Sequence, residues 1–413
     1  METAISNELP IKEIRREFPA LLREHNGFPV AYFDGPGGTQ VPRAVAEAMT
    51  DYLFNHNANT HWEYPTSNET DAIIADARTA FAEMFNASAE EIVFGQNMTS
   101  LTFHLAHALG RGWAEGDEFI VTELDHHANV DTWRSLERDR GMVCRVLPFD
   151  TESGQLMLDK LPGLINERTR IVAIGAASNA IGTINDFAEV CQLARTAGAL
   201  SFVDAVHFAP HNLIDVKAIG CDFLACSAYK FYGPHIGIMF GRKELLESTD
   251  FPKLRPSPDE APERAETGTL GQEAIAGAAA AVDLIASIGT GSSRRERLAT
   301  AFARMHAKDN DLTRKLWNGL ASIANVRVYG PGPDAQRTSL VSFTIGEIPS
   351  ADVSRRLAEK GLFLSHGDFY AATVLERYDI EEQGFVRAGI SVYTTAEEID
   401  RLIEAVGEIA ASV

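Results

Sequence analysis

Cysteine is scarce in this chain, and long apolar runs are missing. Only four of the 413 residues are cysteines, and they form neither a CxxC pair nor the dense framework of small secreted domains. We therefore expect reduced, mostly buried thiols at Cys144, Cys191, Cys221 and Cys226. The longest apolar stretch, from Ala274 to Val282, is far too short to span a bilayer. The N-terminus has no basic segment followed by an apolar run, which predicts that no signal peptide is present.

Positive charge is also in short supply. The chain has 37 Lys and Arg against 58 Asp and Glu, which gives a formal net charge of −21. Nucleic acid and anionic membrane surfaces would repel such a protein, so the sequence argues against both as partners. The remaining composition, 45% apolar and 23% charged, is that of a folded globular protein, and we expect it in the cytoplasm.

Seven short apolar or β-branched runs alternate with helical patterns between residues 91 and 240. That spacing predicts βαβ units and an α/β fold with a mainly parallel, seven-stranded, covered sheet. Strands and helices nearer the C-terminus predict a smaller α+β unit. A chain of 413 residues is too long for one compact core. We expect an N-terminal segment over residues 1–30 that packs on the small domain, a large cofactor-binding domain over 31–285 and a small C-terminal domain over 286–413.

Polar residues that directly follow the apolar runs are candidates for a site, because ligands of open parallel sheets bind beyond the carboxyl ends of the strands. Asp204 ends one run, and Lys230 follows the next one, 26 residues later. A pyridoxal phosphate cofactor needs such a pair: the carboxylate keeps the pyridine nitrogen protonated, and the desolvated amine forms an imine and moves protons. Each residue taken alone also fits a structural role, as a strand cap or a surface lysine.

Three other junctions could complete a cofactor site. The turn Gly95-Gln-Asn-Met-Thr-Ser100 precedes a helical pattern, so its amides and the helix dipole suit a phosphate, with Met98 and Thr99 as contacts. Thr99 also fits a simple N-cap. His126 and Asn179 follow two further runs. An imidazole face could stack on the cofactor ring, and an amide could donate to its phenolate oxygen.

Read together, these motifs resemble the class V aminotransferase family of fold-type-I pyridoxal phosphate enzymes, and within it the cysteine desulfurase-like branch. The match runs from Tyr32-Phe-Asp-Gly35 to Glu397-Glu-Ile-Asp400, nearly the whole chain. The resemblance implies a fold-type-I transferase fold with a Schiff base on Lys230. It also implies that four more residues hold the cofactor. Ser227 would bind its phosphate and Asp204 its ring nitrogen, while His126 would stack on the ring and Asn179 would lie near the phenolate oxygen.

The resemblance extends to the substrate and to a second subunit. Thr99 falls on the family's phosphate-binding threonine. Thr269, in Glu266-Thr-Gly-Thr269, resembles the threonine that reaches the phosphate from the neighbouring subunit, which implies a homodimer with shared active sites. Arg387 resembles the arginine that clamps the substrate carboxylate, a task suited to a bidentate guanidinium. Such a clamp implies a small-molecule amino-acid substrate, which Asn179 also helps to bind.

The chain departs from the family pattern close to the chemistry. His207 stands where the family has glutamine, so a titratable imidazole replaces an amide beside the cofactor. Tyr229 and the pair His61-Trp62 replace a histidine and a His-Arg pair. In desulfurases of this branch one loop ends in the catalytic cysteine, whereas the corresponding loop here ends in Tyr370. All four cysteines precede residue 227, so a persulfide-forming thiolate is expected to be absent from this loop.

Other classes of protein fit less of the sequence. Ser227-Ala-Tyr-Lys230 matches the S-x-x-K pattern of serine acyl-transfer enzymes, but the accompanying S-D-N and K-T-G motifs are missing. The pairs His104/His107, His126/His127 and Asp204/His207 suggest a metal site, yet the first pair lies in an apolar helical run, and we expect no metal. A cofactor-free scaffold would have little use for the lysine, aspartate, stacked histidine and phosphate turn together.

For the reaction, we expect Lys230 to abstract the Cα proton. The leading hypothesis is β-elimination of the carbon–sulfur lyase type on a cysteine-like or other β-substituted amino acid. Tyr370 or His207 would protonate the leaving group, or they only shape the pocket. Transamination and racemisation or epimerisation remain open, and a cofactor-binding regulatory protein is the alternative without turnover.

Overall fold

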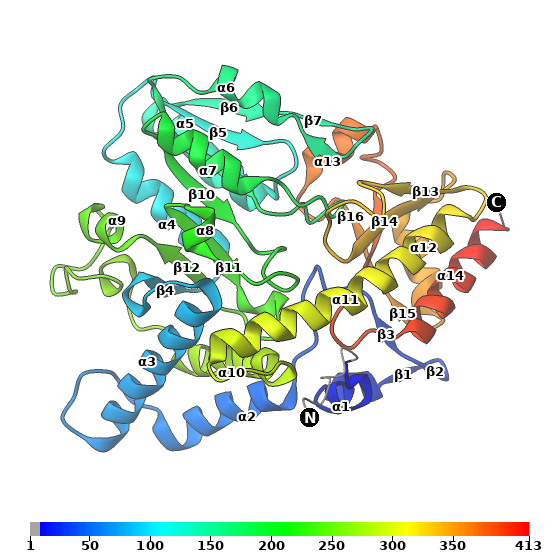
Figure 1. Cartoon of the computed structure of the whole chain (residues 1–413), viewed down its shortest axis with the longest axis horizontal. Coiled ribbons are helices and arrows are strands. Elements are labelled where there is room, and N and C mark those ends of the chain that lie inside the picture. Colours follow the sequence, from blue (N-terminus) through cyan, green and yellow to red (C-terminus); the bar gives the residue numbers. More distant parts are fainter. Residues whose placement is uncertain (1–8, 413) are drawn as a thin grey trace, which may run out of the picture.

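A seven-stranded sheet organises the larger part of the molecule (Figure 1). The computed structural model describes residues 9–412. All strands run parallel except β12, which is antiparallel to both neighbours. From edge to edge the order is β4 (Ile92–Gly95), β12 (Gly237–Gly241), β11 (Phe223–Ser227), β10 (Leu200–Asp204), β9 (Thr169–Gly175), β5 (Glu118–Thr122) and β6 (Val143–Leu147). The predicted mainly parallel, seven-stranded sheet is therefore confirmed.

Six of the seven strands are largely buried on both faces, and the edge strand β6 is mostly exposed. Alternate residues of each strand point to opposite sides of the sheet. On β9, Val172 and Ile174 join the core that contains Phe81 of α3, whereas Ile171 and Ala173 join the core that contains Trp133 of α5. The helices and helical turns of this part are α2 (Arg43–Asp51), η2 (Tyr52–His56), α3 (Pro65–Phe85), η3 (Ala89–Glu91), α4 (Met98–Gly110), η4 (His127–Asn129), α5 (Asp131–Arg140), η5 (Leu158–Lys160), α6 (Leu161–Leu164), α7 (Phe187–Thr196), α8 (Val216–Ile219), η6 (Ala228–Lys230), α9 (Lys243–Ser248), η7 (Glu263–Ala265) and α10 (Gln272–Ile288).

A four-stranded antiparallel sheet organises the C-terminal part, in the order β13 (Val326–Tyr329), β14 (Leu340–Ile345), β17 (Phe385–Gly389) and β16 (Ser365–Gly367). Its helices are α12 (Ser350–Ala358), α13 (Ala372–Tyr378) and α14 (Ala396–Ala410). A separate core of leucine, isoleucine and valine side chains fills the space between sheet and helices, with Val341, Leu357 and Leu402 at its centre. A smaller α+β unit thus stands beside the large sheet.

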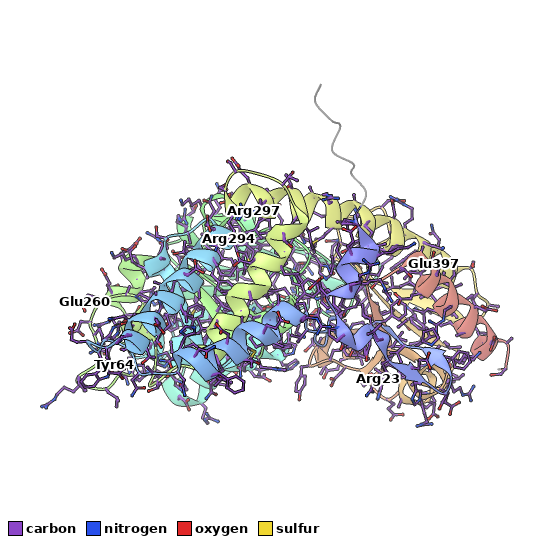
Figure 2. All side chains as sticks on the ribbon, turned by 90° about the horizontal axis from the view of Figure 1, so that it is seen from below. Arg23, Tyr64, Glu260, Arg294, Arg297 and Glu397 are labelled. Carbon is purple, nitrogen blue, oxygen red and sulfur yellow. The ribbon has the colours of Figure 1, made fainter. Side chains whose placement is uncertain are left out.

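The long helix α11 (Arg294–Ala321) crosses from the large sheet to the small one (Figure 1). It begins in a capping box, in which Ser293 and Glu296 satisfy each other's backbone amides. Arg294 ties this end to α10 and α3 through ion pairs with Asp283 (2.8 Å) and Glu83 (2.6 Å). Figure 2 shows Arg294 on the face seen from below, with Tyr64 towards one end of the elongated molecule. Residue 285 lies inside α10, and the division into domains at residues 30 and 285 stays a prediction.

The N-terminal segment contacts the small unit. Its elements are α1 (Ile11–Arg16), η1 (Pro19–Leu22), the hairpin strands β1 (Glu24–His25) and β2 (Phe28–Pro29), and β3 (Ala31–Tyr32). Strand β3 pairs with β15 (Leu362–Phe363), and Arg15 forms a 3.0 Å ion pair with Glu398 of α14. Residues 1–8 of the expected segment lie outside the described residues. Elsewhere in the chain, β7 (Phe149–Asp150) and β8 (Gln155–Leu156) form a short antiparallel hairpin.

Within residues 9–412, no helix combines the length and apolarity needed to cross a bilayer. In the same part of the chain, no group of three or more histidine, cysteine or acidic side chains is arranged to hold a metal ion.

Candidate active site

A cavity of about 1190 Å³ lies beyond the carboxyl ends of the parallel strands, where the large and small units meet. Residues at the ends of β9, β10 and β11 form its floor, and β16, β17 and the loop after β16 close one side. The predicted site residues that line it are Met98, Thr99, His126, Asn179, Asp204, His207, Ser227, Lys230, Tyr370 and Arg387. The structure thus brings ten side chains together that the sequence spreads over almost three hundred residues, although their roles stay predictions.

Thr269 is placed elsewhere. It lines a second cavity of about 540 Å³, which shares Gln96, Ser100 and His235 with the first. Thr269 is exposed and follows Gly268, which has a φ of 69°. Thr269 does not line the main cavity of its own chain.

Lys230 lies on the short turn η6, directly after β11. Its Nζ donates a hydrogen bond to the carbonyl oxygen of Pro36 and lies 4.9 Å from the ring centroid of Tyr229. Burial lowers the pKa of Lys230 to about 7, and the nearby positive charge of Arg387 acts in the same direction. A large share of this amine is therefore unprotonated near neutral pH, which is the form that attacks an aldehyde.

Asp204 ends β10 on the neighbouring strand. Its Oδ1 accepts a hydrogen bond from the amide of Val206 at 2.9 Å. Burial raises the pKa of this carboxyl to about 6, and the positive charge of Lys230 opposes that rise. Burial also raises the pKa of the nearby Asp125 to about 7, and the negative charge of Asp204 acts in the same direction. A carboxylate at this depth binds a protonated ring nitrogen strongly, because little water screens the pair.

The turn before α4 has the features of a phosphate site. Asn97 caps the helix by accepting a hydrogen bond from the amide of Ser100 at 2.9 Å. The amide of Met98 donates to Ser227 Oγ at 3.0 Å, which joins the turn to the end of β11. Gly237 allows this close approach, since a Cβ there would lie 2.4 Å from the carbonyl carbon of Asn97. The first turn of a thirteen-residue helix thus points its amides and dipole at the cavity.

His126 forms the wall above this floor. Its Nδ1 accepts a hydrogen bond from the amide of Ala128 at 2.9 Å, so this nitrogen carries no proton. Burial and then the charge of Lys230 lower the pKa of His126 to about 4, which leaves the ring neutral. The ring of Tyr370 lies 5.5 Å away, and the Tyr370 side chain is 72% exposed at the cavity mouth. A flat, uncharged ring in this place suits packing against another aromatic ring.

Arg387 reaches the cavity from β17 of the small unit. It donates to the carbonyl oxygen of Asn179 at 2.7 Å, and its guanidinium carbon lies 3.8 Å from the ring centroid of Phe369. Burial lowers the pKa of Arg387 to about 9, so the group is still a cation at neutral pH. Arg387 Nη2 lies 3.5 Å from the Oγ atom of Ser365, and both residues line the cavity. The geometry leaves a cation available to a carboxylate that enters the cavity.

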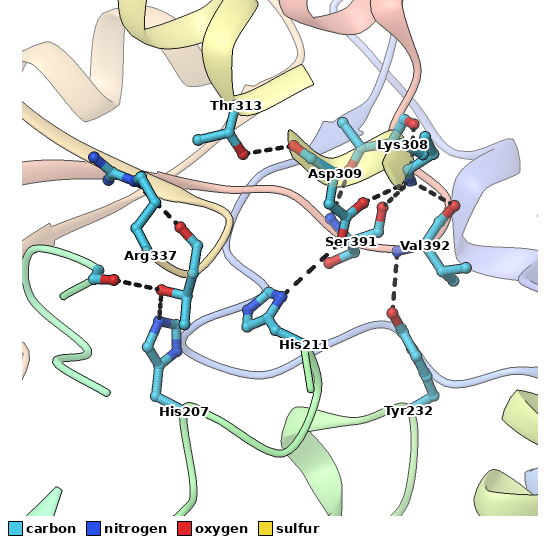
Figure 3. Close-up of polar contacts among 12 residues, drawn as sticks. His207, His211, Tyr232, Lys308, Asp309, Thr313, Arg337, Ser391 and Val392 are labelled. Carbon is cyan, nitrogen blue, oxygen red and sulfur yellow. Dashed lines mark hydrogen bonds and ion pairs between the residues drawn. The ribbon is translucent and has the colours of Figure 1, made fainter. Parts of the chain in front are cut away.

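His207 lines the cavity, and its polar contacts are drawn in Figure 3. Its Nε2 shares a hydrogen bond of 2.9 Å with Thr338 Oγ1, and its ring meets that of His211 edge to face at 5.3 Å. Burial lowers the pKa of His207 well below its ordinary value, so the imidazole is neutral. His207 is therefore linked to the interior behind the cavity as well as to the cavity itself.

The walls fit a polar cofactor. Four buried polar atoms in or beside the cavity wall find no hydrogen-bond partner within residues 9–412: Asn179 Oδ1, Arg387 Nε, His127 Nε2 and Asp34 Oδ1. Leaving such atoms unpaired costs free energy, and a ligand with hydroxyl, carboxylate or phosphate groups relieves that cost. We take this, together with the helix N-terminus and the lysine, as the structural fit to pyridoxal phosphate.

The structure also reveals two features that the sequence motifs did not identify. Asp34 lies near Lys230 and Arg387, and burial raises the pKa of its carboxyl to about 6. The signal was present, since a polar residue follows the apolar run ending at Phe33. His127 and Asp131, both in the cavity wall, form a contact of 2.9 Å between Nδ1 and Oδ2. Their i,i+4 spacing was visible, but only the fold places the pair at the cavity.

None of the four cysteines lines the cavity. Burial raises the pKa of Cys144 to about 11 and that of Cys191 to about 12, and it also raises the pKa of Cys221 and Cys226. These thiols are therefore protonated at neutral pH and poor nucleophiles.

The fold and the cavity place this protein among the pyridoxal phosphate-dependent enzymes of fold type I. Comparison with known proteins narrows the assignment: the chain belongs to the class V aminotransferase family, whose model matches residues 31–402. It is similar to the cysteine desulfurase of Dickeya dadantii (strain 3937), with 32% identity over 410 residues and 95% of each chain covered. It is also similar to that of Klebsiella pneumoniae (strain 342), with 33% identity over 409 residues, covering 95% of this chain and 96% of the relative.

Solved structures agree with this assignment. The apo cysteine desulfurase from Thermococcus onnurineus NA1 superposes with a TM-score of 0.88 at 26% identity, covering 98% of this chain and 99% of that one. The cysteine desulfurase CsdA from Escherichia coli superposes with a TM-score of 0.84 at 27% identity, covering 97% and 98%. The predicted family, fold class and cofactor are confirmed.

The depressed pKa of Lys230 leads to a prediction for cofactor uptake. Protonated amine does not attack the cofactor aldehyde, so the rate should follow the unprotonated fraction and rise as pH increases through the pKa. With a pKa of about 7, uptake of pyridoxal phosphate by the apo protein should rise about tenfold between pH 6 and pH 8 and then level off. Stopped-flow absorbance measures this rate. A midpoint close to the ordinary 10.5 would contradict the assigned burial of the amine.

Proposed function

We propose that this protein is a pyridoxal phosphate-dependent lyase that catalyses β-elimination from an amino acid with a β-leaving group, of the carbon–sulfur lyase type. The observation that carries the proposal is the make-up of the cavity: it contains Lys230, Asp204 and Arg387 but no cysteine. Desulfuration through a persulfide needs a thiolate next to the substrate. With Tyr370 at the cavity mouth instead, elimination is the outcome that the remaining groups support.

The residues proposed to hold the cofactor all line the cavity. Lys230 would attach to its aldehyde carbon, and Asp204 would bind the ring nitrogen. His126 would pack on the ring face, and Asn179 would offer its amide to the phenolate oxygen. The N-terminus of α4, with the main chain of Met98 and Thr99 and the hydroxyl of Ser227, would hold the phosphate. When bound, the cofactor withdraws electrons from the substrate Cα and makes its proton acidic.

The chain's own residues then orient the substrate and move its protons. Arg387 binds the α-carboxylate and, together with Asn179, orients the substrate in the cavity. Lys230 would take the Cα proton, a task that suits an amine with a pKa of about 7. Of the two candidates for protonating the leaving group, His207 already shares its Nε2 with Thr338. We therefore assign that proton to Tyr370, which lies on the mouth side and is exposed.

A panel of β-substituted amino acids tests the proposal. Pyruvate and ammonia should form without added keto acid, and Cys144→Ser should turn over at the parent rate, since this thiol lies outside the cavity. Coupled lactate dehydrogenase and ammonia assays measure both products. If product formed only in the presence of a keto-acid acceptor, the enzyme would be an aminotransferase and not a lyase. Loss of substrate chirality without products would indicate an epimerase, and an intact cofactor spectrum without turnover on any substrate would indicate a regulatory protein.

We also propose a homodimer with shared active sites, working in the cytoplasm. The exposed Thr269 borders a cavity that adjoins the main one, so a second copy can receive it at its phosphate site. Large apolar side chains are exposed on the α2–α3 region, among them Phe54 at 81% and Trp62 at 59%. Exposed apolar groups of this size mark surfaces that pair with another protein.

A further inference from the structure

A row of buried polar side chains leads from the cavity to helix α11 (Figure 3). His207 meets His211 edge to face at 5.3 Å, and His211 Nδ1 lies 4.0 Å from Asp309 Oδ2. Lys308 Nζ lies 3.2 Å from the other carboxylate oxygen of Asp309. The row begins at a residue of the cavity wall and ends at an ion pair on α11, the long helix that crosses between the two units.

The row lies mostly in the interior. His207 is 4% exposed and Asp309 is 3% exposed, while the side chains of His211 and Lys308 are 10% and 18% exposed. Lys308 is held in place by hydrogen bonds from Nζ to the carbonyl oxygens of Ser391 (2.7 Å) and Val392 (2.9 Å). Removing an ion pair from water costs several kcal/mol, so a chain keeps one in its interior only where it is paired and bonded as here.

One buried atom in the row, His211 Nδ1, lacks a hydrogen-bond partner among residues 9–412, whereas Asp309 Oδ1 is paired with the Lys308 ammonium at 3.2 Å. Burial lowers the pKa of His211 to about 4, while the charge of Asp309 opposes that change. The row therefore contains a neutral imidazole beside a carboxylate, with hydrogen-bonding capacity left over.

A small void lies between this row and the catalytic lysine. Its volume is about 10 Å³, which is close to the space that one water molecule requires. Polar groups surround it, and its lining residues include His207, His211, Lys230, Tyr232 and Ser391. A buried site of this size with several polar neighbours is the kind that holds an ordered water.

We propose that this void binds one water molecule, which connects Lys230 to His211, and that His211 and Asp309 form a buried proton relay behind the lysine, with the His207 ring packed against His211. A proton passes from Nζ to the water while the water gives a proton to the His211 ring, so no charge is created or lost. Asp309 remains ionised and stabilises the imidazolium that forms. His211 and Asp309 are positioning residues, because they act through Lys230 and touch no substrate. The inference rests on the proposed attachment of the cofactor to Lys230.

The charges around the relay determine in which direction a mutation should shift the midpoint of the titration. Lys230 is faced by Asp34, Asp204 and Arg387, and His207 is faced by His211, Arg387 and Lys230. His211 is faced by His306, Lys308 and Asp309. Removing the negative charge of Asp309 therefore makes every protonated state of this cluster less favourable, whereas removing the positive charge of Lys308 makes those states more favourable.

The test is a pH titration of the visible absorbance of the bound cofactor, without substrate. Asp309→Asn should shift the midpoint down by about half to one pH unit, and Lys308→Gln should shift it up by a similar amount. Asp311→Asn is the matched control, because Asp311 lies on the same helix but is 82% exposed at its side chain, and it should leave the midpoint unchanged. A crystal structure of the holoenzyme should contain one water in the void.

Three results would overturn the relay: unchanged midpoints in Asp309→Asn and Lys308→Gln, shifts of both in the same direction, or a holoenzyme whose void contains no water. Opposite shifts separate an electrostatic role from simple loss of structure, which thermal unfolding of each variant monitors. The titration needs no turnover, so it is independent of which reaction the enzyme catalyses. A parent protein that never takes up the cofactor would instead refute the proposed site.

Discussion

Lys230→Ala is expected to remove the visible absorbance of the bound cofactor and to reduce turnover by about 10²–10⁴-fold or more. The variant loses both the amine that binds the aldehyde and the group that carries the Cα proton. No other lysine lines the cavity within the described part of the chain, so none can substitute. Absorbance spectra of the purified protein, recorded with and without added pyridoxal phosphate, measure the first effect. Product formation under single-turnover conditions measures the second.

Lys243→Ala is a suitable control for this change. Lys243 is exposed at the start of α9, where its Nζ lies 3.5 Å from Glu90 Oε1 and outside the cavity lining, so its loss should change neither spectrum nor rate. The Lys230→Ala apo protein should remain folded, since burying an amine costs free energy that alanine does not incur. Full absorbance in Lys230→Ala would show that another residue binds the cofactor.

Arg387→Met is expected to raise the KM for an amino-acid substrate by about 30–1000-fold. The estimate follows from the roughly 2–4 kcal/mol lost when one partner of a buried, hydrogen-bonded charge pair is truncated, at about 1.4 kcal/mol per factor of ten. The α-carboxylate would then enter a site without its cation. The effect should be much smaller for an amine analogue that lacks this carboxylate. Steady-state kinetics with both compounds measure the difference.

Arg327→Met provides the matched control for Arg387→Met. Arg327 lies on β13 of the same sheet, but its side chain is exposed and stacks on the ring of Tyr329 instead of facing the cavity. Its removal should leave the KM unchanged. Equal KM values for parent and Arg387→Met would show that the carboxylate is bound elsewhere. Circular dichroism and the cofactor spectrum confirm that the cavity is intact in the variant.

Local patterns were sufficient to predict much of the fold. The apolar runs of the large sheet are buried strands whose alternate residues enter two different cores, and that periodicity is written in the sequence. The order of the strands could not be predicted from them, because pairing depends on contacts between distant segments. The antiparallel direction of β12 is an example: it inserts between β4 and β11, which lie more than a hundred residues apart in the chain.

The residues of the site also fall into those that local sequence patterns could predict and those that they could not. Lys230, Asp204 and His126 were recognisable because each follows an apolar run, and strand ends of a parallel sheet converge on one edge. Arg387 and Tyr370 could be placed near them only by resemblance, since they belong to the small unit and reach the cavity through the packing of two units. Asp309 had no such signal at all, because it lies within a long helix whose buried face only the fold defines.

By itself, the sequence determined the residue types, their positions at strand ends and the absence of a cysteine after residue 226. These follow from covalent order and short-range periodicity, and together with the family resemblance they were enough to predict Lys230 as the cofactor lysine. Tertiary structure alone decided the pKa and the surroundings of the lysine. Burial lowers its pKa to about 7, and a water-sized void separates it from His211, which lies beside Asp309. Burial and proximity arise only when distant segments pack, because desolvation depends on all the atoms that surround a group and not on its neighbours in the chain.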